Sequence, residues 1–529
     1  MDKTLGIMLD CSRNAVMKVE TVKEYVKILK KMGYNTLMLY TEDTYEVEGE
    51  PCFGHLRGRY SMDELKEIDK FCVENSIELI PCIQTLAHLE NMFKWESEYD
   101  DVKDCDNILL CGEEKTYILI DKMISSIAKC FTSRKIHIGM DEAYRVGTGK
   151  YQLIHGIEDR FDIINNHLHK VCEICNKYGF EAMIWSDMFI KFAMNIQDQY
   201  ADADTNLIKE KAELPQNVSL VYWDYYSKDY NRYATQIKNH KIFGRKTYFA
   251  GGSWTWKGIA PDNKFSIETT IPAMKACSDE GVDGVFITMW GDNGSECSKY
   301  AVLPSLMVAA EYYRGNTNME SVKDKFKEIV GAEFDDFMLM DELDYVGGKH
   351  ENNPSKYLLY NDLFMGLKDY LISEDDALYY EKLLKKFKNI KRDNKYSYIF
   401  DTYEKLCELL VIKSTLGIRT RKAYKSGDID NVKSLIPDYD KFLELLEEFH
   451  TLFENRWFKE NKPHGFDVQD IRLGGLMGRA KSCRKRLIDL IDGKIDSIPE
   501  LMEKVISKQN GSSNNWWADV VTPNSLYNI

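Results

Sequence analysis

Short apolar runs alternate with longer segments of helical period through roughly the first 300 residues. A strand buried on both faces gives a continuous apolar run, whereas a helix with one buried face repeats its apolar residues every three or four positions. Segments of the helical kind, such as "VKEYVKILKKMGY" and "SMDELKEIDKFCVENS", fill the intervals between the runs. We predict eight strands, at residues 5–10, 35–40, 77–83, 135–141, 180–187, 218–224, 246–252 and 284–290.

Eight buried strands with intervening helices match a (β/α)8 barrel, and a doubly wound open sheet is the competing arrangement. From about Tyr312 the strand runs stop, and long charged helical patterns such as "YDKFLELLEEFHTLFENRWFKEN" follow. We therefore predict an α/β chain with a TIM barrel over residues 1–315 and an all-helical C-terminal domain over residues 316–529. Pro463, His464 and Gly465 interrupt the helical pattern, so residues 462–479 are predicted as a loop.

Every predicted strand end carries polar or aromatic residues. In barrels of this class the catalytic residues lie at the C-terminal ends of the strands. Five of the nine tryptophans fall at or just after a strand, which favours a small pocket where aromatic rings stack on a sugar. In strand order, the residues are Asp10 and Arg13; Glu42 and Asp43; Gln84 and His88; Asp141 and Glu142; Trp185 and Asp187; Trp223, Asp224 and Tyr225; Trp254 and Trp256; Trp290 and Asp292.

The adjacent carboxylates Asp141 and Glu142 end the fourth run, "KIHIGMDE". Strand alternation turns His137 and Asp141 toward the barrel interior and places Glu142 at the mouth. Capping of a following helix is the alternative, but "AYRVGTGKYQ" delays any helical pattern. A partly desolvated carboxyl group beside another charge has a raised pKa, so we predict Glu142 as a general acid and Asp141 as a group that orients or stabilises the substrate.

The motif "HIGMDEA" resembles the His-x-Gly-x-Asp-Glu signature of the glycoside hydrolase family 20 β-N-acetylhexosaminidases. The resemblance covers roughly residues 4 to 315, the extent of the predicted barrel. Further segments that are similar to the family are "LDCSRNA" with Arg13, "YTEDT" with Glu42, "LAHLE" with His88, "MIWSD" with Trp185, "VYWDYY" with Trp223, and "MWGDNGSE" with Trp290.

The resemblance implies an exo-acting enzyme that removes terminal non-reducing β-linked N-acetylglucosamine or N-acetylgalactosamine. It implies a retaining mechanism in which the substrate's own 2-acetamido oxygen attacks and closes to an oxazoline-like intermediate. Asp141 would then hold the acetamido N–H, and Glu142 would protonate the leaving oxygen and later activate water. Arg13 would hold sugar hydroxyls, and Trp290 would lie under the sugar ring. The implied substrate is a small glycan with a terminal N-acetylhexosamine.

Three features depart from the family pattern. The first predicted strand begins almost at Met1, so we expect no small domain before the barrel. The final Trp-x-Glu becomes Trp290-Gly291-Asp292, and the resemblance implies that the shorter carboxylate of Asp292 would bind the distal sugar hydroxyls, in a different way from glutamate. The tyrosine that steadies the acetamide has no clear counterpart in "YFAGGSWTWKG", and Tyr225 and Tyr222 are equal candidates for its role.

Two other functions stay open at this point. A conventional retaining β-glycosidase would use Glu142 as acid and base, with Asp224 or Asp292 as nucleophile across the bond that is cut. It would act on sugars that lack a 2-acetamido group. A non-catalytic sugar-binding barrel is the other possibility, although it would not need the Asp141–Glu142 pair.

Composition narrows the class of protein. The chain has 529 residues, 44% of them hydrophobic, which is typical of a folded protein with a substantial core. A net charge of −15 disfavours a nucleic-acid partner. No stretch approaches the roughly 20 apolar residues of a membrane helix, so we expect no membrane partner. Oligomeric state is left open, with a homodimer as one possibility.

Thirteen cysteines are scattered through apolar segments, and Cys172 and Cys175 form the single close pair. Without a second pair to complete a zinc site, buried thiols are the simpler interpretation. The start "MDKTLGIMLDCS" lacks the basic and apolar regions of a secretion signal, so we predict a reducing, cytoplasmic location. His88 and His137 lack metal-binding spacing, and we expect neither metal nor cofactor.

Overall fold

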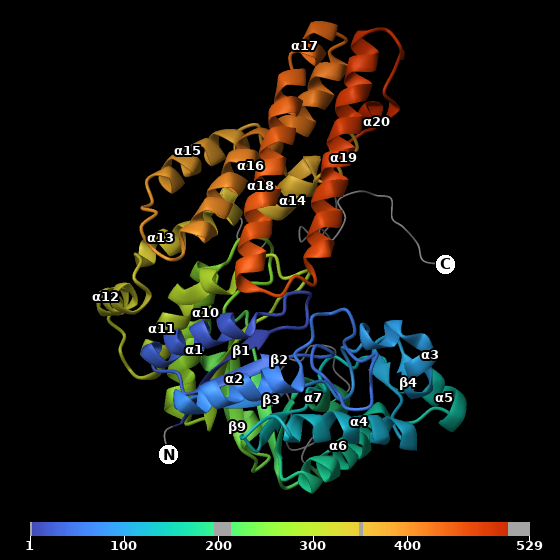
Figure 1. Ribbon diagram of the computed structural model, residues 1–529, viewed down its shortest axis with the longest axis vertical. Helices are drawn as coiled ribbons and strands as arrows, with labels where there is room; N and C mark the ends of the chain where they lie inside the picture. Colours follow the sequence, from blue (N-terminus) through green and yellow to red (C-terminus); the bar gives the residue numbers. More distant parts are fainter. Residues whose placement is uncertain (1–2, 195–212, 349–352, 506–529) are drawn as a thin grey trace. The chain divides into compact units, whose positions relative to one another are not determined.

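The computed structural model describes residues 3–194, 213–348 and 353–505 (Figure 1). The chain divides into two compact units whose segments alternate along the sequence. The first, here called the barrel unit, comprises Met1–Ser253, Ser266–Trp290 and Ser305–Lys325. The second, the helical unit, comprises Trp254–Phe265, Gly291–Pro304 and Phe326–Ile529. Two stretches of the region predicted as barrel, one between the last two strands and one directly after the last strand, therefore belong to the helical unit.

In the described part of the chain, eight parallel strands close into a barrel in the order β1-β10-β9-β8-β7-β6-β3-β2. The closed order confirms the predicted TIM barrel and rules out the open sheet. Each strand coincides with one of the predicted apolar runs. The strands are β1 (Thr4–Asp10), β2 (Thr36–Tyr40), β3 (Glu78–Cys82), β6 (Lys135–His137), β7 (Glu181–Trp185), β8 (Val218–Trp223), β9 (Thr247–Gly252) and β10 (Gly284–Met289).

Helices cover the outside of the barrel because one side of each is apolar (Figure 1). Helix α1 (Val19–Met32) ends at Gly33, whose φ of 87° closes the last turn. Helix α2 (Met62–Glu74) begins with a capping box between Ser61 and Glu64. The other helices of this region are α4 (Glu114–Ala128), α6 (Arg160–Lys177), α7 (Asp187–Met194), α9 (Tyr230–Lys241), α10 (Asn263–Glu280), α11 (Leu303–Tyr313) and α12 (Met319–Val330).

Side chains fill the barrel interior and leave the chemistry to its ends. The inward residues form one buried cluster: Met8, Met38, Tyr40, Ile80, Cys82, Met183, Trp185, Val221, Tyr248, Ala250 and Phe286. His137 also faces inward, as predicted, with its ring centroid 4.4 Å from that of Trp185. Strand β6 stops at His137, four residues short of the predicted end, because Gly139 and Met140 take φ values of 74° and 75°.

The loop after β3 contains elements that the apolar pattern did not predict. They are the short helix α3 (Glu96–Tyr99) and the antiparallel pair β4 (Lys103–Cys105) and β5 (Ile108–Leu109). Helix α5 (Lys150–His155) begins well after Glu142, so neither acidic residue caps it. All thirteen cysteines are free thiols, as expected. Within the described residues, none of the helices is both long and apolar enough to span a bilayer.

The helical unit is built around three long helices, and α18 contacts both of the others. The loop predicted over residues 462–479 is wrong for most of its length. Gly465, with φ of 88°, turns the chain, and α19 starts at Phe466 and buries Gln469, Leu473 and Leu476 along one face. The helices are α13 (Phe334–Met338), α14 (Pro354–Tyr360), α15 (Asp376–Lys388), α16 (Ser397–Lys425), α17 (Ile429–Lys433), α18 (Ile436–Glu460), α19 (Phe466–Ile491) and α20 (Pro499–Met502).

Candidate active site

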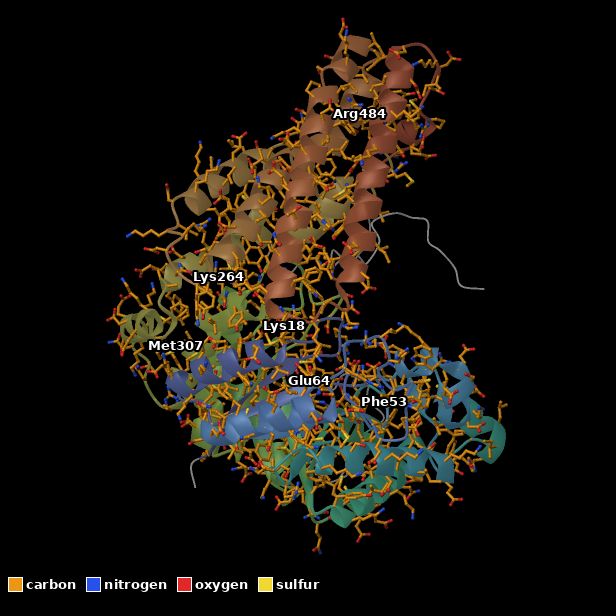
Figure 2. All side chains as sticks on the ribbon, in the orientation of Figure 1. Lys18, Phe53, Glu64, Lys264, Met307 and Arg484 are labelled. Carbon is orange, nitrogen blue, oxygen red and sulfur yellow. The ribbon has the colours of Figure 1, made fainter. Side chains whose placement is uncertain are left out.

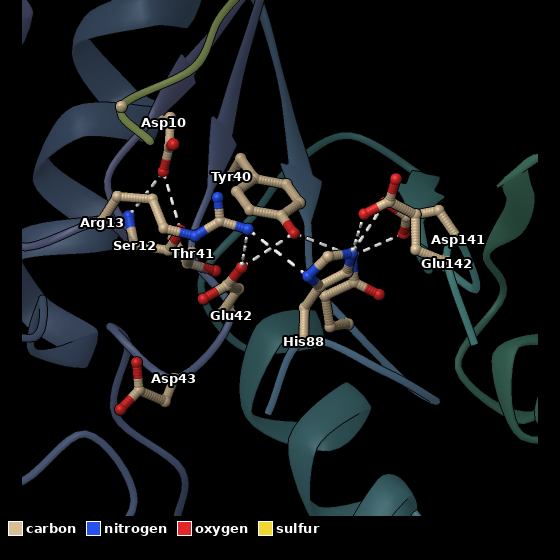
Figure 3. Close-up of polar contacts among 12 residues, drawn as sticks. Asp10, Ser12, Arg13, Tyr40, Thr41, Glu42, Asp43, His88, Asp141 and Glu142 are labelled. Atoms are coloured by element: carbon tan, nitrogen blue, oxygen red, sulfur yellow. Dashed lines mark hydrogen bonds and ion pairs between the residues drawn. The ribbon is translucent and has the colours of Figure 1, made fainter. Parts of the chain in front are cut away.

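Six side chains from four neighbouring strand ends form a closed ring of contacts at the C-terminal end of the barrel (Figure 3). Arg13 Nη2 lies 3.0 Å from Glu42 Oε1, which also accepts a hydrogen bond from the Tyr40 hydroxyl at 3.0 Å. Gln84 Nε2 donates to the Tyr40 oxygen at 2.8 Å and to Asp141 Oδ1 at 2.7 Å. We call these residues, together with His88, the barrel-end ring.

His88 completes the barrel-end ring. Its Nε2 lies 3.2 Å from Asp141 Oδ2 and 3.6 Å from Glu142 Oε2, and its Nδ1 lies 3.4 Å from Arg13 Nη2. Burial opposes a charge on His88, but the carboxylates of Asp141 and Glu42 raise its pKa to about 9. A protonated His88 donates to Asp141, and its contact with Arg13 is then a close approach of two donors.

Asp141 and Glu142 differ in environment although they are adjacent. Burial alone would raise the pKa of Asp141, but the charge of His88 and the hydrogen bonds from His88 and Gln84 outweigh burial and hold that pKa below its usual value. Burial and the nearby charge of Asp141 raise the pKa of Glu142. The Glu142 side chain is 42% exposed, against 13% for Asp141. One carboxyl group is therefore held ionised, and its neighbour is an accessible acid.

The backbone is strained where these residues meet. Glu42, His88, Met140 and Glu142 have φ values of 42°, 58°, 75° and 52°, a region that residues other than glycine seldom adopt. Such residues cluster at functional sites, where the surrounding structure holds them in place. Gly139 has φ of 74°, and a Cβ atom there would overlap Gln84 Oε1. The glycine of the motif therefore makes room for Gln84.

An aromatic group lies beside the acidic pair in the barrel unit. Trp185 is buried, with its ring centroid 6.1 Å from that of Trp290. Trp290 in turn meets Tyr40 edge to face at 4.8 Å, and Trp223 stacks on Tyr225 at 5.2 Å. The structure thus brings together three of the predicted tryptophans and places Tyr225 among them.

Tyr222 and Asp224 point to the other side of β8. The Tyr222 ring lies 5.1 Å from His240 of α9, and its hydroxyl donates to Asp224 Oδ2. Asp224 also pairs with Arg232 Nε at 3.1 Å and accepts backbone N–H bonds from two residues of the following turn. These contacts make Asp224 a structural residue of the turn, and they favour Tyr225 over Tyr222 as a substrate contact.

Trp254, Trp256 and Asp292 belong to the helical unit. The two tryptophans stack with centroids 4.5 Å apart and an interplanar angle of 24°. Asp292 lies in the stretch Gly291–Pro304, directly after Trp290 and Gly291 in the chain. A substrate-binding role for these three residues stays a prediction.

Two family descriptions match the sequence. "Glycosyl hydrolase family 20, catalytic domain" matches residues 5–313, more than half of the chain. The chain belongs to glycoside hydrolase family 20. "Glycoside Hydrolase 20C C-terminal domain" matches residues 335–518, in the predicted helical region. The family and the enzyme class predicted from "HIGMDEA", a glycoside hydrolase of the hexosaminidase type, are confirmed.

Two named proteins and one solved structure are similar to this chain. Hexosaminidase D of Bos taurus is 26% identical over 256 residues, covering 47% of this chain and 69% of that protein. Hexosaminidase D of Homo sapiens is 25% identical over 221 residues, covering 40% of this chain and 43% of that protein, so less than half of the human protein is matched. The crystal structure of the β-N-acetylhexosaminidase from Bacteroides fragilis NCTC 9343 has a TM-score of 0.47 and 19% identity, covering 62% of this chain and 70% of that one.

Four further residues join the site of this family 20 hydrolase. Gln84 and Asp187 were predicted at strand ends without an assigned role, and Tyr40 and Tyr144 were not predicted. Tyr40 and Gln84 belong to the barrel-end ring, and their signal was the strand alternation that puts them on the inward side with Met38 and Cys82. Tyr144 donates to Glu142 Oε1 at 3.3 Å and accepts from Lys191 at 3.1 Å. Asp187 accepts from the backbone N–H of Glu142 at 3.3 Å.

In the described ranges, no group of three or more His, Cys, Asp or Glu side chains is arranged to hold a metal ion. The acidic and histidine side chains of the barrel-end ring are instead paired with one another and with Arg13, Tyr40 and Gln84.

Proposed function

We propose that this protein removes terminal non-reducing β-linked N-acetylhexosamine residues from glycans, with retention of configuration and with the substrate's acetamido group as nucleophile. The observation that carries the proposal is the different environment of two adjacent carboxyl groups. Asp141 is buried and held ionised, whereas Glu142 is accessible and has a raised pKa. Such a pair suits an acid and a charge stabiliser that act on the same side of one sugar.

In the first step, protonated Glu142 gives its proton to the glycosidic oxygen as the bond from that oxygen to C1 breaks. The carbonyl oxygen of the 2-acetamido group forms a new bond to C1, and positive charge develops on the resulting oxazolinium ring. The Asp141 carboxylate accepts the acetamido N–H and stabilises that charge. The barrel-end ring fixes Asp141 by Gln84 and His88, so little reorganisation accompanies the step.

In the second step, the Glu142 carboxylate takes a proton from water as the water oxygen bonds to C1 from the face that the leaving group vacated. The bond from C1 to the acetamido oxygen breaks, which restores the acetamide. Two displacements leave the configuration unchanged, and Glu142 ends protonated as it began. Among the aromatic residues, we assign Trp290 to the sugar face and Tyr225 to the acetamide carbonyl.

The conventional two-carboxylate mechanism is less well supported. Asp224, one of its two candidate nucleophiles, has its oxygens engaged by Arg232, Tyr222 and backbone N–H groups. A nucleophilic carboxylate needs an oxygen that can reach C1, and in retaining enzymes it lies about 5 Å from the carboxyl group of the acid. Asp292 is the remaining candidate, and the substrate pair described below distinguishes it.

The test uses two chromogenic β-glycosides that are identical except for a 2-acetamido or a 2-hydroxyl group. We expect cleavage of the acetamido substrate alone, with kcat lowered about 10²- to 10⁴-fold by Glu142→Gln and by Asp141→Asn. Glu173→Gln, at an exposed position on α6, is the matched control and should behave as the wild type. Equal cleavage of the hydroxyl substrate would overturn the mechanism and direct attention to Asp292.

A cytoplasmic location, a small glycan substrate and a homodimer remain predictions. Cell fractionation with an antibody against the chain tests the first, and enzyme found outside the cell would contradict it. Activity on polymers but not on short oligosaccharides would contradict the second. Sedimentation of the purified protein tests the third, and a monomer at all concentrations would contradict it.

A further inference from the structure

The segment that carries Asp292 is embedded in the helical unit. Asp292 begins a short turn in which Asn293, Gly294 and Ser295 have φ values of 61°, 110° and 54°. Asn293 and Ser295 are strained in this region, whereas Gly294 adopts it without strain. Such a conformation persists only where its surroundings hold it.

Side chains from two long helices supply that support by binding the backbone of the turn. Arg472 Nη1 of α19 donates to the carbonyl oxygen of Asn293 at 2.7 Å. Gln469 Nε2, one helical turn earlier, donates to the carbonyl oxygen of Gly294 at 3.0 Å. Arg456 of α18 donates to the carbonyl oxygen of Glu296. Three of four successive carbonyl groups are thus bound by helical side chains.

The Glu296 carboxylate anchors the same turn. Its Oε2 lies 2.6 Å from Lys356 Nζ of α14, and its Oε1 lies 3.0 Å from Arg472 Nη1. Glu296 and Lys356 are both only 1% exposed. Because buried charges are stable only when paired, this contact fixes the distance between α14, α19 and the turn.

The fit between the turn and α19 is close. A Cβ atom at Gly294 would lie 2.8 Å from Arg472 Nη1 and 3.0 Å from Gln469 Nε2. The guanidinium group of Arg472 therefore occupies the space next to the turn and touches both its backbone and Glu296. Displacement of Arg472 must move the turn, and Asp292 lies directly before it in the chain.

We propose that Arg472 is a positioning residue that sets substrate affinity by holding Asp292, the carboxylate predicted to bind the sugar hydroxyls. The inference rests on the proposed function, because it presumes a sugar substrate. A carboxylate–hydroxyl hydrogen bond depends on placement within about 0.5 Å, so a shift of the turn weakens sugar binding and leaves the reacting pair in place.

The test compares KM and kcat on the acetamido glycoside. Arg472→Met should raise KM about tenfold and change kcat less than about threefold, the pattern of a lost binding interaction. Arg472→Lys, which keeps a donor, should recover part of the affinity. Arg484→Met is the control: Arg484 (Figure 2) is also on α19 but pairs with Asp440, and the variant should keep the wild-type KM.

A double-mutant cycle with Asp292→Asn decides whether Arg472 acts through Asp292. If it does, the double variant should raise KM no more than Asp292→Asn alone. Multiplied effects, or a fall in unfolding temperature with KM unchanged, would overturn the proposal. Gly294→Ala reaches the same contact from the turn and should reproduce the higher KM if Arg472→Met fails to fold. The wild-type result with the paired glycosides tests the proposed function separately, before any variant is compared.

Discussion

Around Asp141, six side chains of the barrel unit hold one another in a closed ring, whereas around Asp292 the backbone of a turn is held by cations and an amide from distant helices. The ring joins residues whose strands are neighbours in the barrel. The turn joins residues separated by up to 179 positions in sequence. The catalytic pair thus depends on local geometry and protonation, and the Asp292 turn depends on the presence and packing of the helical unit.

The largest expected effect comes from removing the helices. A chain that ends after Lys325 keeps the stretch with Glu296 but loses Lys356 and Arg472. Stranding one buried charge costs about 3–5 kcal/mol, a large part of a typical stability of about 5–15 kcal/mol. We expect no cooperative thermal unfolding by circular dichroism and no turnover. The full chain is the control, and wild-type unfolding of the shorter chain would contradict the comparison.

A second prediction separates the steric overlap of a new side chain with the barrel-end ring from the backbone strain that the new side chain causes. Gly139 and Gly179 have nearly equal φ values of 74° and 73°, but a Cβ atom would overlap Gln84 at the first and meet nothing within 4 Å at the second. Both alanine variants should lose about 1 kcal/mol from backbone strain. Gly139→Ala alone should also lower kcat about 100-fold, because Gln84 and Asp141 must move. Equal kcat in the two variants would show that the ring tolerates displacement.

A third prediction concerns the protonation of Asp141. Gln84 donates to Asp141 and lowers its pKa, so Gln84→Leu should raise that pKa. Because Asp141 must be ionised to act, the acidic limb of the pH profile of kcat/KM should move to higher pH. At the low-pH end of the profile, kcat/KM should fall about tenfold. Tyr40→Phe breaks the barrel-end ring but removes no hydrogen-bond donor from Asp141. The acidic limb of the pH profile of this variant should therefore stay at the wild-type pH. An identical shift in both variants would mean that the ring acts as one unit.

The smallest effect is on stability. Burial raises the pKa of Glu42 from 4.5 to about 7. Between these values the folded chain keeps a proton that the unfolded chain releases, so this contribution is fully present below about pH 4.5 and declines as pH rises to 7. The unfolding temperature of Glu42→Gln should therefore depend less on pH than that of the wild type across this range. Glu173→Gln is the exposed control, and a parallel pH dependence of all three proteins would contradict the assignment.

The sequence predicted the barrel because strands buried on both faces leave apolar runs that are readable without partners. The acidic pair was found for the same reason, since it follows such a run. Alternation did not extend beyond His137, because Gly139 and Met140 leave the extended conformation. Tyr40 was overlooked as a site residue, although alternation put it on the inward side, and Gln84 was predicted at a strand end without an assigned role.

The membership of Trp254 and Asp292 in the helical unit could not be predicted. Both follow barrel strands in sequence, and the helical residues that hold the Asp292 turn, such as Gln469 and Arg472, come much later in the chain. The loop predicted over 462–479 was wrong because Gly465 permits a sharp turn after which α19 resumes at once. Pattern along the chain reports local structure, and contacts between remote segments leave no periodic signal.

Because the segments of the two units alternate along the chain, recombination between homologous genes can separate residues that contact one another. A single recombination point after Pro304 would take α18 and α19 from one parent and the turn they hold, with its Gly294, from the other. The offspring would pair a guanidinium group with a turn that was selected beside a different neighbour. Among homologous sequences, residues 293–296 should therefore change together with positions 356, 469 and 472, and lineages should exchange the helical region as a whole only when these positions agree.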